Sequence, residues 1–427
     1  MDNAEIVKNY INNSRIITKP YQYSEEKYRF LYWVVTMNKD VPYDYPKLEM
    51  CYSLKKTSEQ VTVKGCDQYL IHDVAIARFM DSMNACILCK DIPKWIVEKF
   101  IRKCYAEEYY SMGDLIRAYI SKLYVDEIKE KYERTTIEKD YIYPNRSRMI
   151  MIQEIFIILH EIAHFRMSKY SKEDYQKKIS EKRAFLIQDD TMIKVIESGL
   201  EPAFSKALLD NLKFEKNTHL LGNIDKFAVD PKYWKAYHSW LQEYYSYDKN
   251  IEEIICDEFA VFSLEDSLFP LLGPNYLDYT NPQLAETEYK DLLYKACYLA
   301  LQNLYYLMLI ENDARRISHQ NNIKGTGPYS AVFSFTPVIQ PRKRNYIRAI
   351  IRHESAGKSD SQRRKIGMKW ANLAKYLDGI YDDFEDIFQG NYSCCDKDKL
   401  VFEQTNGLDY ETLRRNTAKS LTEILFW

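Results

Sequence analysis

The residues best suited to chemistry in this sequence are two histidines and a glutamate in the run His160-Glu161-Ile162-Ala163-His164. Two histidines four residues apart on a helix project from one face, so both imidazoles can reach a single ion. A glutamate directly after the first histidine points to the adjoining side of that ion. There it can take a proton from a zinc-bound water and later deliver it to a leaving amine. His160 and His164 are therefore predicted to bind Zn²⁺, with Glu161 as the general base.

The surroundings of this run strengthen the prediction. The chain has only seven histidines, so a chance match to the spacing is uncommon. Residues 149–159 are apolar on nearly every face except at Gln153 and Glu154, which predicts a buried helix over residues 147–170. Burying polar side chains is costly unless they have partners. The alternative, that the histidines and the glutamate are satisfied structural residues, is therefore the less favoured one.

A catalytic zinc usually needs a third protein ligand and one open position. A third histidine six residues after His164 is absent, because Tyr170 occupies that place. The best candidate is Glu253, on a helix predicted over residues 250–265. Asp257 lies four residues later on the same face and is predicted to accept a hydrogen bond from a ligand histidine, which fixes the tautomer of the ring.

Two alternatives to Glu253 as the third ligand stay open. The run Asn250-Ile251-Glu252-Glu253 also matches a capping box that begins a helix, although a capping box does not account for Asp257. His238 is the rival ligand, but a lone histidine among aromatic residues, here in the segment 234–240, is more often structural.

The two motifs together resemble those of the gluzincin metallopeptidases, which combine an H-E-x-x-H helix with a later E-x-x-x-D helix. The resemblance implies that His160, His164 and Glu253 bind one Zn²⁺ per chain, that Glu161 is the general base, and that Asp257 is a carboxylate that orients a ligand. It further implies a zincin-like core and a hydrolase, a zinc metalloendopeptidase that cleaves peptide bonds.

Two intracellular bacterial groups within the gluzincins are similar to parts of this chain. The segment 66–88, a short strand and then an amphipathic helix, resembles the Lit-type phage-exclusion peptidases. The segment 251–270, a glutamate-containing helix that ends near a proline, resembles the ImmA/IrrE-like regulatory peptidases. These resemblances imply an intracellular protein or peptide substrate and a role in phage exclusion or regulation.

The composition is that of an ordinary globular protein and predicts mostly helices. The chain has 427 residues, enough for two or three units, and 46% of them are hydrophobic. Glycine (12) and proline (13) are scarce, and few helix breakers over such a length favour helices. The formal net charge of −2 gives no overall attraction to nucleic acid or anionic lipid.

The sequence predicts a cytoplasmic protein without a membrane span. Its first residues lack the basic and then apolar pattern of a signal peptide. The apolar run 296–310 is interrupted by Gln302 and Asn303, and the run 149–159 is too short to cross a bilayer. The nine cysteines are odd in number and scattered, so buried free thiols are favoured over disulfides; the same holds for the single C-x-x-C pair at 86–89.

The predicted fold class is α+β and mainly helical, with a zincin-like core, a small N-terminal sheet and a helical C-terminal region. Residues 1–140 form a mixed region, with strands expected at 48–54, 60–64 and 68–71. Residues 141–275 carry the predicted catalytic helices and a helical insertion at 171–249. Residues 276–427 form the C-terminal region, with a long helix expected at 283–318 and a basic stretch at 342–370.

The basic stretch motivates a second function, that of a non-catalytic regulator or nucleic-acid-binding protein built on the same scaffold. In it, Tyr346 and Trp370 could stack on bases. A solvated helix face is the favoured interpretation of the stretch, so nucleic acid is a possible but not a favoured partner.

Two features of the predicted peptidase stay open. An oxyanion is usually stabilised by a tyrosine, histidine or arginine, and Tyr329, Arg344 and His353 are available downstream. The predicted strand at 68–71 is a candidate to pair with an extended substrate by strand addition.

Overall fold

The structure is a computed structural model, and two compact units can be distinguished in it. Unit 1 comprises Met1–Glu154, Asn303–Val332 and Ile380–Trp427, and unit 2 comprises Ile155–Gln302 and Phe333–Gly379. The residues that the structure describes are 2–14, 25–36, 45–63, 67–89, 92–132, 145–189, 242–272, 282–322, 339–390, 411–412 and 415.

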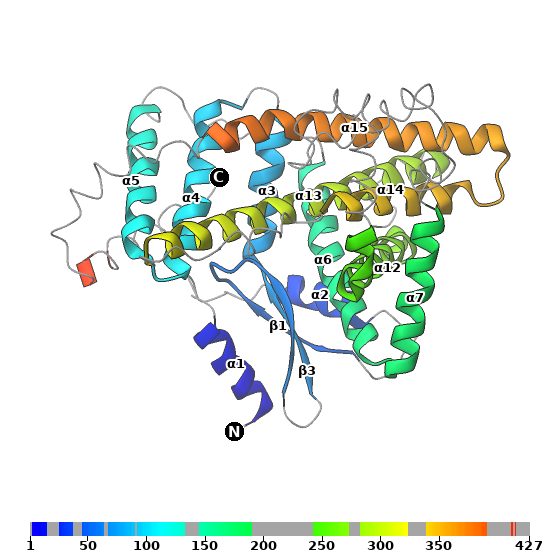
Figure 1. Cartoon of the computed structure of the whole chain (residues 1–427), viewed down its shortest axis with the longest axis horizontal. Helices are drawn as coiled ribbons and strands as arrows, with labels where there is room; N and C mark the ends of the chain where they lie inside the picture. Colours follow the sequence, from blue (N-terminus) through cyan, green and yellow to red (C-terminus); the bar gives the residue numbers. More distant parts are fainter. Residues whose placement is uncertain are drawn as a thin grey trace. The chain divides into compact units, whose positions relative to one another are not determined.

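The mainly helical α+β class is confirmed: the described elements are helices except for one three-stranded sheet (Figure 1). The two units are assembled from separate segments of the chain. The three consecutive regions predicted from the sequence were drawn from local sequence patterns and not from contacts between segments. Their boundaries stay predictions.

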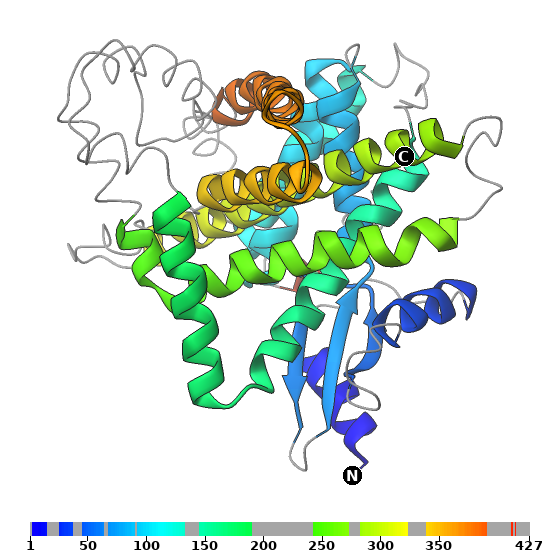
Figure 2. The ribbon, with the colours of Figure 1, turned by 90° about the vertical axis from the view of Figure 1, so that its right-hand side faces the viewer.

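The sheet of unit 1 consists of β1 (Lys47–Cys51), β2 (Ser58–Thr62) and β3 (Gln68–Asp73), seen together in Figure 2. All three predicted strands are confirmed, with ends that differ by up to three residues. β1 ends early because the chain turns around the Asp73 carboxylate, which accepts hydrogen bonds from the backbone N–H groups of Ser53 and Lys56.

The expectation that the strand at 68–71 pairs with a substrate is wrong. The strand order is β1-β3-β2, with β3 parallel to β1 and antiparallel to β2. Both edges of β3 are therefore already paired, and a central strand has no backbone groups left for another chain.

In the part of unit 1 that the structure describes, five helices precede the histidine helix. They are α1 (Asn3–Ser14), α2 (Glu25–Thr36), α3 (Ala75–Leu88), α4 (Lys94–Ser111) and α5 (Leu115–Tyr132). α3 buries most of its surface, including Asn84, whose side-chain amide donates to the Gln153 side chain at 2.8 Å. This bond ties α3 to the first part of the next helix within unit 1.

Within the described residues, six helices supply unit 2, and three of them also extend into unit 1. They are α6 (Arg146–Ser168), α7 (Lys172–Asp189), α12 (Asp248–Leu272), α13 (Pro282–Asn322), α14 (Ile339–Ser355) and α15 (Asp360–Gly390). The helices predicted at 147–170, 250–265 and 283–318 are confirmed. α12 continues beyond its predicted end near 265 and includes Pro270. A proline this close to the end of a helix removes only one backbone hydrogen bond, so the helix can continue past it.

An apolar cluster joins α6, α7 and the beginning of α12 in unit 2. Its buried members are Ala163, Met167, Ile179, Leu186, Tyr244, Tyr245, Ile251, Ile254 and Cys256. Each Å² of apolar surface that these side chains remove from water contributes about 25 cal/mol. This burial is the main force that holds α6 against α12. The cluster therefore fixes which face of the histidine helix meets α12.

The basic stretch 342–370 forms parts of α14 and α15 and is not one solvated face. Tyr346 is 1% exposed and its hydroxyl donates to the Tyr294 carbonyl at 2.9 Å. Trp370 is fully buried and its indole N–H donates to the Glu354 carboxylate at 2.5 Å. The proposed stacking of Tyr346 and Trp370 on bases is therefore wrong, because neither ring reaches the surface.

None of the described helices combines the length and the apolar character that a bilayer-spanning segment requires. The six cysteines within the described residues are free thiols, as the sequence predicted, and four of them are buried: Cys51, Cys104, Cys256 and Cys297.

Candidate metal centre

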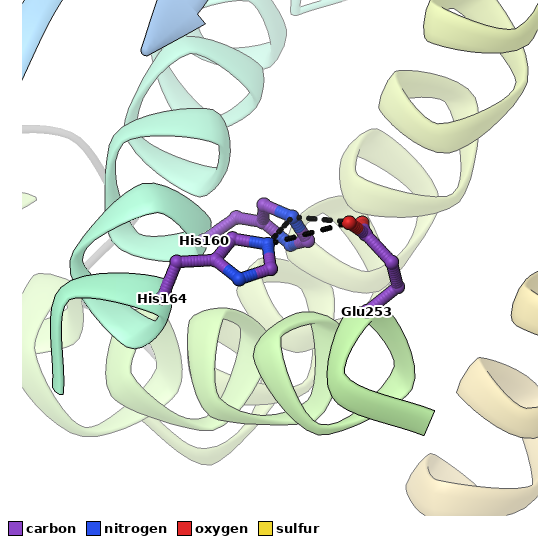
Figure 3. Close-up of side chains that lie close together, drawn as sticks. All are labelled: His160, His164 and Glu253. Carbon is purple, nitrogen blue, oxygen red and sulfur yellow. Dashed lines mark hydrogen bonds and ion pairs between the residues drawn. The ribbon is translucent and has the colours of Figure 1, made fainter. Parts of the chain in front are cut away.

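The candidate metal centre begins on α6, where the sequence places two histidines one turn apart. The residues around them, Ile158, Leu159 and Ile162, are buried in unit 2, so this part of the helix is held by packing. The His160 side chain is 11% exposed, whereas the His164 side chain is 21% exposed. Because i and i+4 side chains share a face, both rings point to the same side of α6, towards α12 (Figure 3).

Glu253 of α12 completes a group of three potential metal ligands with His160 and His164 (Figure 3). The two imidazole Nε2 atoms are 3.1 Å apart. Glu253 Oε2 lies 3.2 Å from His160 Nε2, and Glu253 Oε1 lies 3.5 Å from His164 Nε2. Zinc bonds of about 2.0–2.1 Å at tetrahedral angles place neighbouring ligand atoms about 3.3–3.4 Å apart. The two imidazole nitrogens and the Glu253 carboxylate, which offers one oxygen to each ring, therefore lie within the range of separations found around a tetrahedral zinc ion.

The far nitrogen of each imidazole faces its own carboxylate. His164 Nδ1 lies 2.7 Å from Glu252 Oε1, and His160 Nδ1 lies 3.0 Å from Asp257 Oδ1, although the second contact is off the line of a hydrogen bond. A carboxylate at Nδ1 favours the tautomer with its proton there. With the protons on Nδ1, both Nε2 lone pairs would point to the same place as the Glu253 carboxylate. A cation bound there would remove the repulsion between them.

A second group of potential ligands shares His164 and consists of its Nδ1, Glu252 and Cys256. Here Nδ1 and the Glu252 oxygen are only 2.7 Å apart, a hydrogen-bond distance that is too short for two ligands of one ion. Tyr175 of α7 donates to the other oxygen of Glu252 at 2.7 Å. Glu252 is therefore hydrogen-bonded to His164, whereas Asp257 makes only an ion-pair contact with His160.

The capping-box interpretation of residues 250–253 is wrong. Asn250 lies inside α12, which begins at Asp248, and its side-chain amide donates to the Tyr244 carbonyl at 2.9 Å. Glu253 therefore does not act as the glutamate of a capping box. Its carboxylate contacts the two histidines instead. The rival ligand His238 lies outside the described residues.

Arg342 of α14 is a site residue that the sequence analysis assigned to a solvated face. Its Nε donates to Asp257 Oδ2 at 2.8 Å and one terminal nitrogen donates to Asp257 Oδ1 at 2.7 Å. The other terminal nitrogen lies 3.0 Å from Glu253 Oε2. Burial opposes ionisation of Glu253, but the charge of Arg342 and the contacts with the histidines outweigh it and hold the pKa of Glu253 well below its ordinary value.

The site attracts positive charge. Three carboxylates, those of Glu252, Glu253 and Asp257, contact the histidines, and the Arg342 guanidinium contacts two of them, so acids outnumber the cation in this group. Burial would lower the pKa of His160, yet the contacts with Asp257 and Glu253 outweigh burial and raise it to about 9. Either protons or a metal ion can balance this excess, and the converging Nε2 atoms favour the metal.

Glu161 meets the physical requirements for a general base. Its pKa is raised, chiefly because burial penalises the charged carboxylate, and the charges of His160, His164 and Arg342 oppose that effect only in part. A carboxylate with a raised pKa binds a proton more strongly than an exposed one, as proton transfer near neutral pH requires.

Two of the three oxyanion candidates from the sequence are described. His353 lies 3.3 Å from Glu265, which is twelve residues and about 18 Å along α12 from Glu253, so it is not at the site. Arg344 is two residues from Arg342 on α14, and a two-residue step turns a helical side chain by about 200° to the other side. Tyr329 lies outside the described residues.

Two further site residues were not singled out from the sequence. Glu252 stands beside Glu253 in α12, and adjacent positions on a helix point about 100° apart, so the two carboxylates can flank both histidines. Tyr175 gave no signal, because its role depends on how α7 packs on α12.

Comparison of the chain with models of known protein families, with curated proteins and with solved structures finds no match. The resemblance of the two motifs to the gluzincins therefore stays a prediction made from the residues themselves.

Proposed function

We propose that this chain is a zinc metalloendopeptidase that hydrolyses peptide bonds in an intracellular protein or peptide. One observation carries the proposal: the Nε2 atoms of His160 and His164, 3.1 Å apart, and the Glu253 carboxylate come together as a group that could hold one metal ion. Glu161, which is half-buried, interacts electrostatically with both histidines and with Glu253.

His160, His164 and Glu253 would hold one Zn²⁺ and leave a fourth position open. Zinc in such a site supplies Lewis acidity, which polarises a carbonyl and lowers the pKa of water towards 7. The donor set of two imidazoles and one carboxylate matches the His₂Glu set of catalytic zinc sites.

Glu161 would take the proton of the attacking water and deliver it to the nitrogen of the leaving amine. Its burial raises its pKa, so the protonated carboxyl persists long enough to act as the acid of the second step. Asp257 and Glu252 would keep the Nδ1 protons of His160 and His164 in place, and so keep both Nε2 lone pairs available.

The proposal is tested by zinc analysis of the purified chain and by mass spectrometry of the peptides it releases from a cell extract. We expect one zinc per chain and a cleavage activity that chelation abolishes. Glu161→Gln should lose about 10²–10⁴-fold of that activity while it retains zinc. Glu258→Gln is the matched control, since Glu258 pairs with Lys182 and Arg352 and contacts neither histidine in the described contacts. Full activity of Glu161→Gln would overturn the mechanism.

The alternative function, a non-catalytic regulator or nucleic-acid-binding protein, keeps the basic stretch 342–370 as its motive but loses the proposed base stacking, because Tyr346 and Trp370 are buried. Salt-dependent binding of DNA or RNA without chelator-sensitive cleavage would favour this alternative function. A role in phage exclusion or regulation follows only from the resemblance, and comparison of the proteins in cells that express the native chain or Glu161→Gln would identify the substrate.

A further inference from the structure

Arg342 connects the third ligand of the proposed metal centre to the carboxylate behind the first. It makes a two-pronged contact with Asp257 and a third contact, at 3.0 Å, with Oε2 of Glu253. The Asp257 side chain is 2% exposed and the Arg342 side chain 17%, so water does not substitute for these bonds easily. A planar guanidinium fixes the positions of both carboxylates, which a single ammonium group does not.

α14 is locked in the rotation that directs Arg342 towards α12. The next residue, Lys343, is 2% exposed and contacts the Asp378 carboxylate and the Gln302 side-chain oxygen. Asn345 donates to the Tyr245 hydroxyl at 3.2 Å, and Tyr346 donates to the Tyr294 carbonyl. These buried contacts on the other sides of α14 hold the helix in register, so Arg342 is presented as a fixed group.

We propose that Arg342 is a positioning residue for the metal centre, which holds Oε2 of Glu253 so that the carboxylate offers one oxygen to the cation, and which holds Asp257 against His160. The inference rests on the proposed metal site but not on peptide hydrolysis. Restricting Glu253 to one oxygen keeps the coordination number low and leaves a position open for chemistry.

A second possible role of Arg342, that of a positive charge which repels the metal ion, predicts the opposite effect on metal affinity. If Arg342 acted only as a nearby positive charge, its removal would strengthen the binding of a divalent cation. If it positions Glu253 and Asp257, its removal weakens binding, because partners behind metal ligands typically contribute about 10–100-fold to affinity.

The experiment measures Zn²⁺ affinity by competition with a chromophoric chelator, and coordination from the visible spectrum of the Co²⁺-loaded chain. Arg342→Met should bind Zn²⁺ about 10–100-fold more weakly. Its Co²⁺ bands should become weaker, as they do when coordination rises above four. Arg342→Lys keeps the positive charge but lacks the two-pronged guanidinium. Its Zn²⁺ affinity should therefore lie between those of Arg342→Met and the wild type.

Arg352→Met is the matched control. Arg352 also projects from α14 to an acid of α12, Glu258, at 3.2 Å, but it touches none of the three ligands in the described contacts. It should retain the wild-type affinity and Co²⁺ spectrum. Thermal unfolding of every variant shows whether it is folded, and Arg342→Lys supplies the comparison should the methionine variant not fold.

Unchanged or tighter Zn²⁺ binding in folded Arg342→Met would overturn the inference, as would complete recovery of affinity and spectrum in Arg342→Lys. No substrate is used, so a chain that binds metal but cleaves nothing would contradict the proposed function and leave this inference intact. A chain that binds no metal at the three ligands would overturn both.

Discussion

Histidines beside carboxylates occur in both units, and their two nitrogens meet different surroundings. In unit 1, His72 is fully buried, its Nδ1 lies 2.7 Å from the Ser58 hydroxyl and its Nε2 lies 2.9 Å from Glu154. In unit 2, the Nδ1 atoms of His160 and His164 face carboxylates, whereas their Nε2 atoms face each other at 3.1 Å.

We infer that this difference separates a structural histidine from the proposed metal ligands. His72 has one partner for each nitrogen, and Lys27 adds a 2.9 Å ion pair to Glu154, so the group is complete without any other species. The pair in unit 2 brings two imidazole Nε2 atoms and the Glu253 carboxylate to one place. A histidine near a carboxylate is therefore not itself a sign of a metal; convergence of its free lone pair with others is.

The balance of charge differs in the same way. Within unit 1, Lys56 and Lys103 are buried together with Glu107 and Glu108, two cations with two acids. In the site of unit 2, three carboxylates contact the two histidines and one guanidinium, that of Arg342, contacts two of those carboxylates. A closed set of buried charges is a structural element, whereas an open set calls for a further cation.

The comparison predicts its largest effect for His164→Ala. Loss of one ligand of three should reduce bound zinc from one per chain to a trace, since the remaining pair cannot hold the ion. In the wild-type chain, zinc at one hundred times its Kd should stabilise the fold by about 2.7 kcal/mol, and this increment should vanish in the variant. Metal analysis and thermal unfolding with and without a chelator measure both effects. Equal zinc in the two proteins would place the ion elsewhere.

The next effect concerns the carboxylate behind His164. Glu252→Gln should weaken zinc binding by about 10–100-fold, because the amide no longer fixes the Nδ1 proton of His164 as strongly. Competition with a chelator measures the change. Gln176→Ala, which removes an exposed bond from α7 to Asp248, is the control and should leave the affinity unchanged. A normal affinity in Glu252→Gln would show that Glu252 does not orient the ring.

The buried charges of unit 1 predict a dependence of stability on pH. Burial raises the pKa of Glu108 to about 7, so the folded chain keeps this proton where the unfolded chain, at the ordinary value of 4.5, has lost it. Stability should therefore fall as pH rises from about 4.5 to 7, by about 2–3 kcal/mol for this group.

Replacement of Glu108 removes this dependence. Urea unfolding of Glu108→Gln at several pH values should show a smaller decline than the wild type between pH 4.5 and 7. Glu127→Gln changes an exposed residue of α5 and should keep the wild-type slope. An unaltered slope in Glu108→Gln would refute the assignment.

The smallest effect is expected for His72→Leu, the counterpart of the zinc ligands in unit 1. Two hydrogen bonds are lost, but Lys27 still pairs with Glu154, so the cost should be about 1–2 kcal/mol of stability. Zinc content should stay at one per chain. If His72→Leu lost zinc, the contrast between the two kinds of histidine would fail.

Local patterns predicted most of the elements that carry the site. The apolar residues before His160 predicted α6 to within two residues, and the spacing of four placed both imidazoles on one face. The spacing of Glu253 and Asp257 likewise put two acids on one side of α12. These features depend on helix geometry, which neighbouring residues set.

The sequence was least informative where a contact joins distant segments. It assigned Arg342 to a solvated face, yet the residue lies between Glu253 and Asp257, 85 positions from the latter. It also offered the strand at 68–71 to a substrate, whereas strand order makes β3 central. Runs of basic residues look alike whether they face water or a buried acid, and alternating strands look alike at an edge or in the centre.

The sequence by itself therefore determined that two histidines and a glutamate share one buried helix, because a helical repeat is a local property of the chain. Only the tertiary structure decided which carboxylate meets the free Nε2 atoms, which acids hold the Nδ1 atoms, and that Arg342 joins Glu253 to Asp257. Those choices follow from the packing of α6, α7, α12 and α14 around the apolar cluster and the buried pairs of unit 2. Packing brings together residues that no local pattern relates.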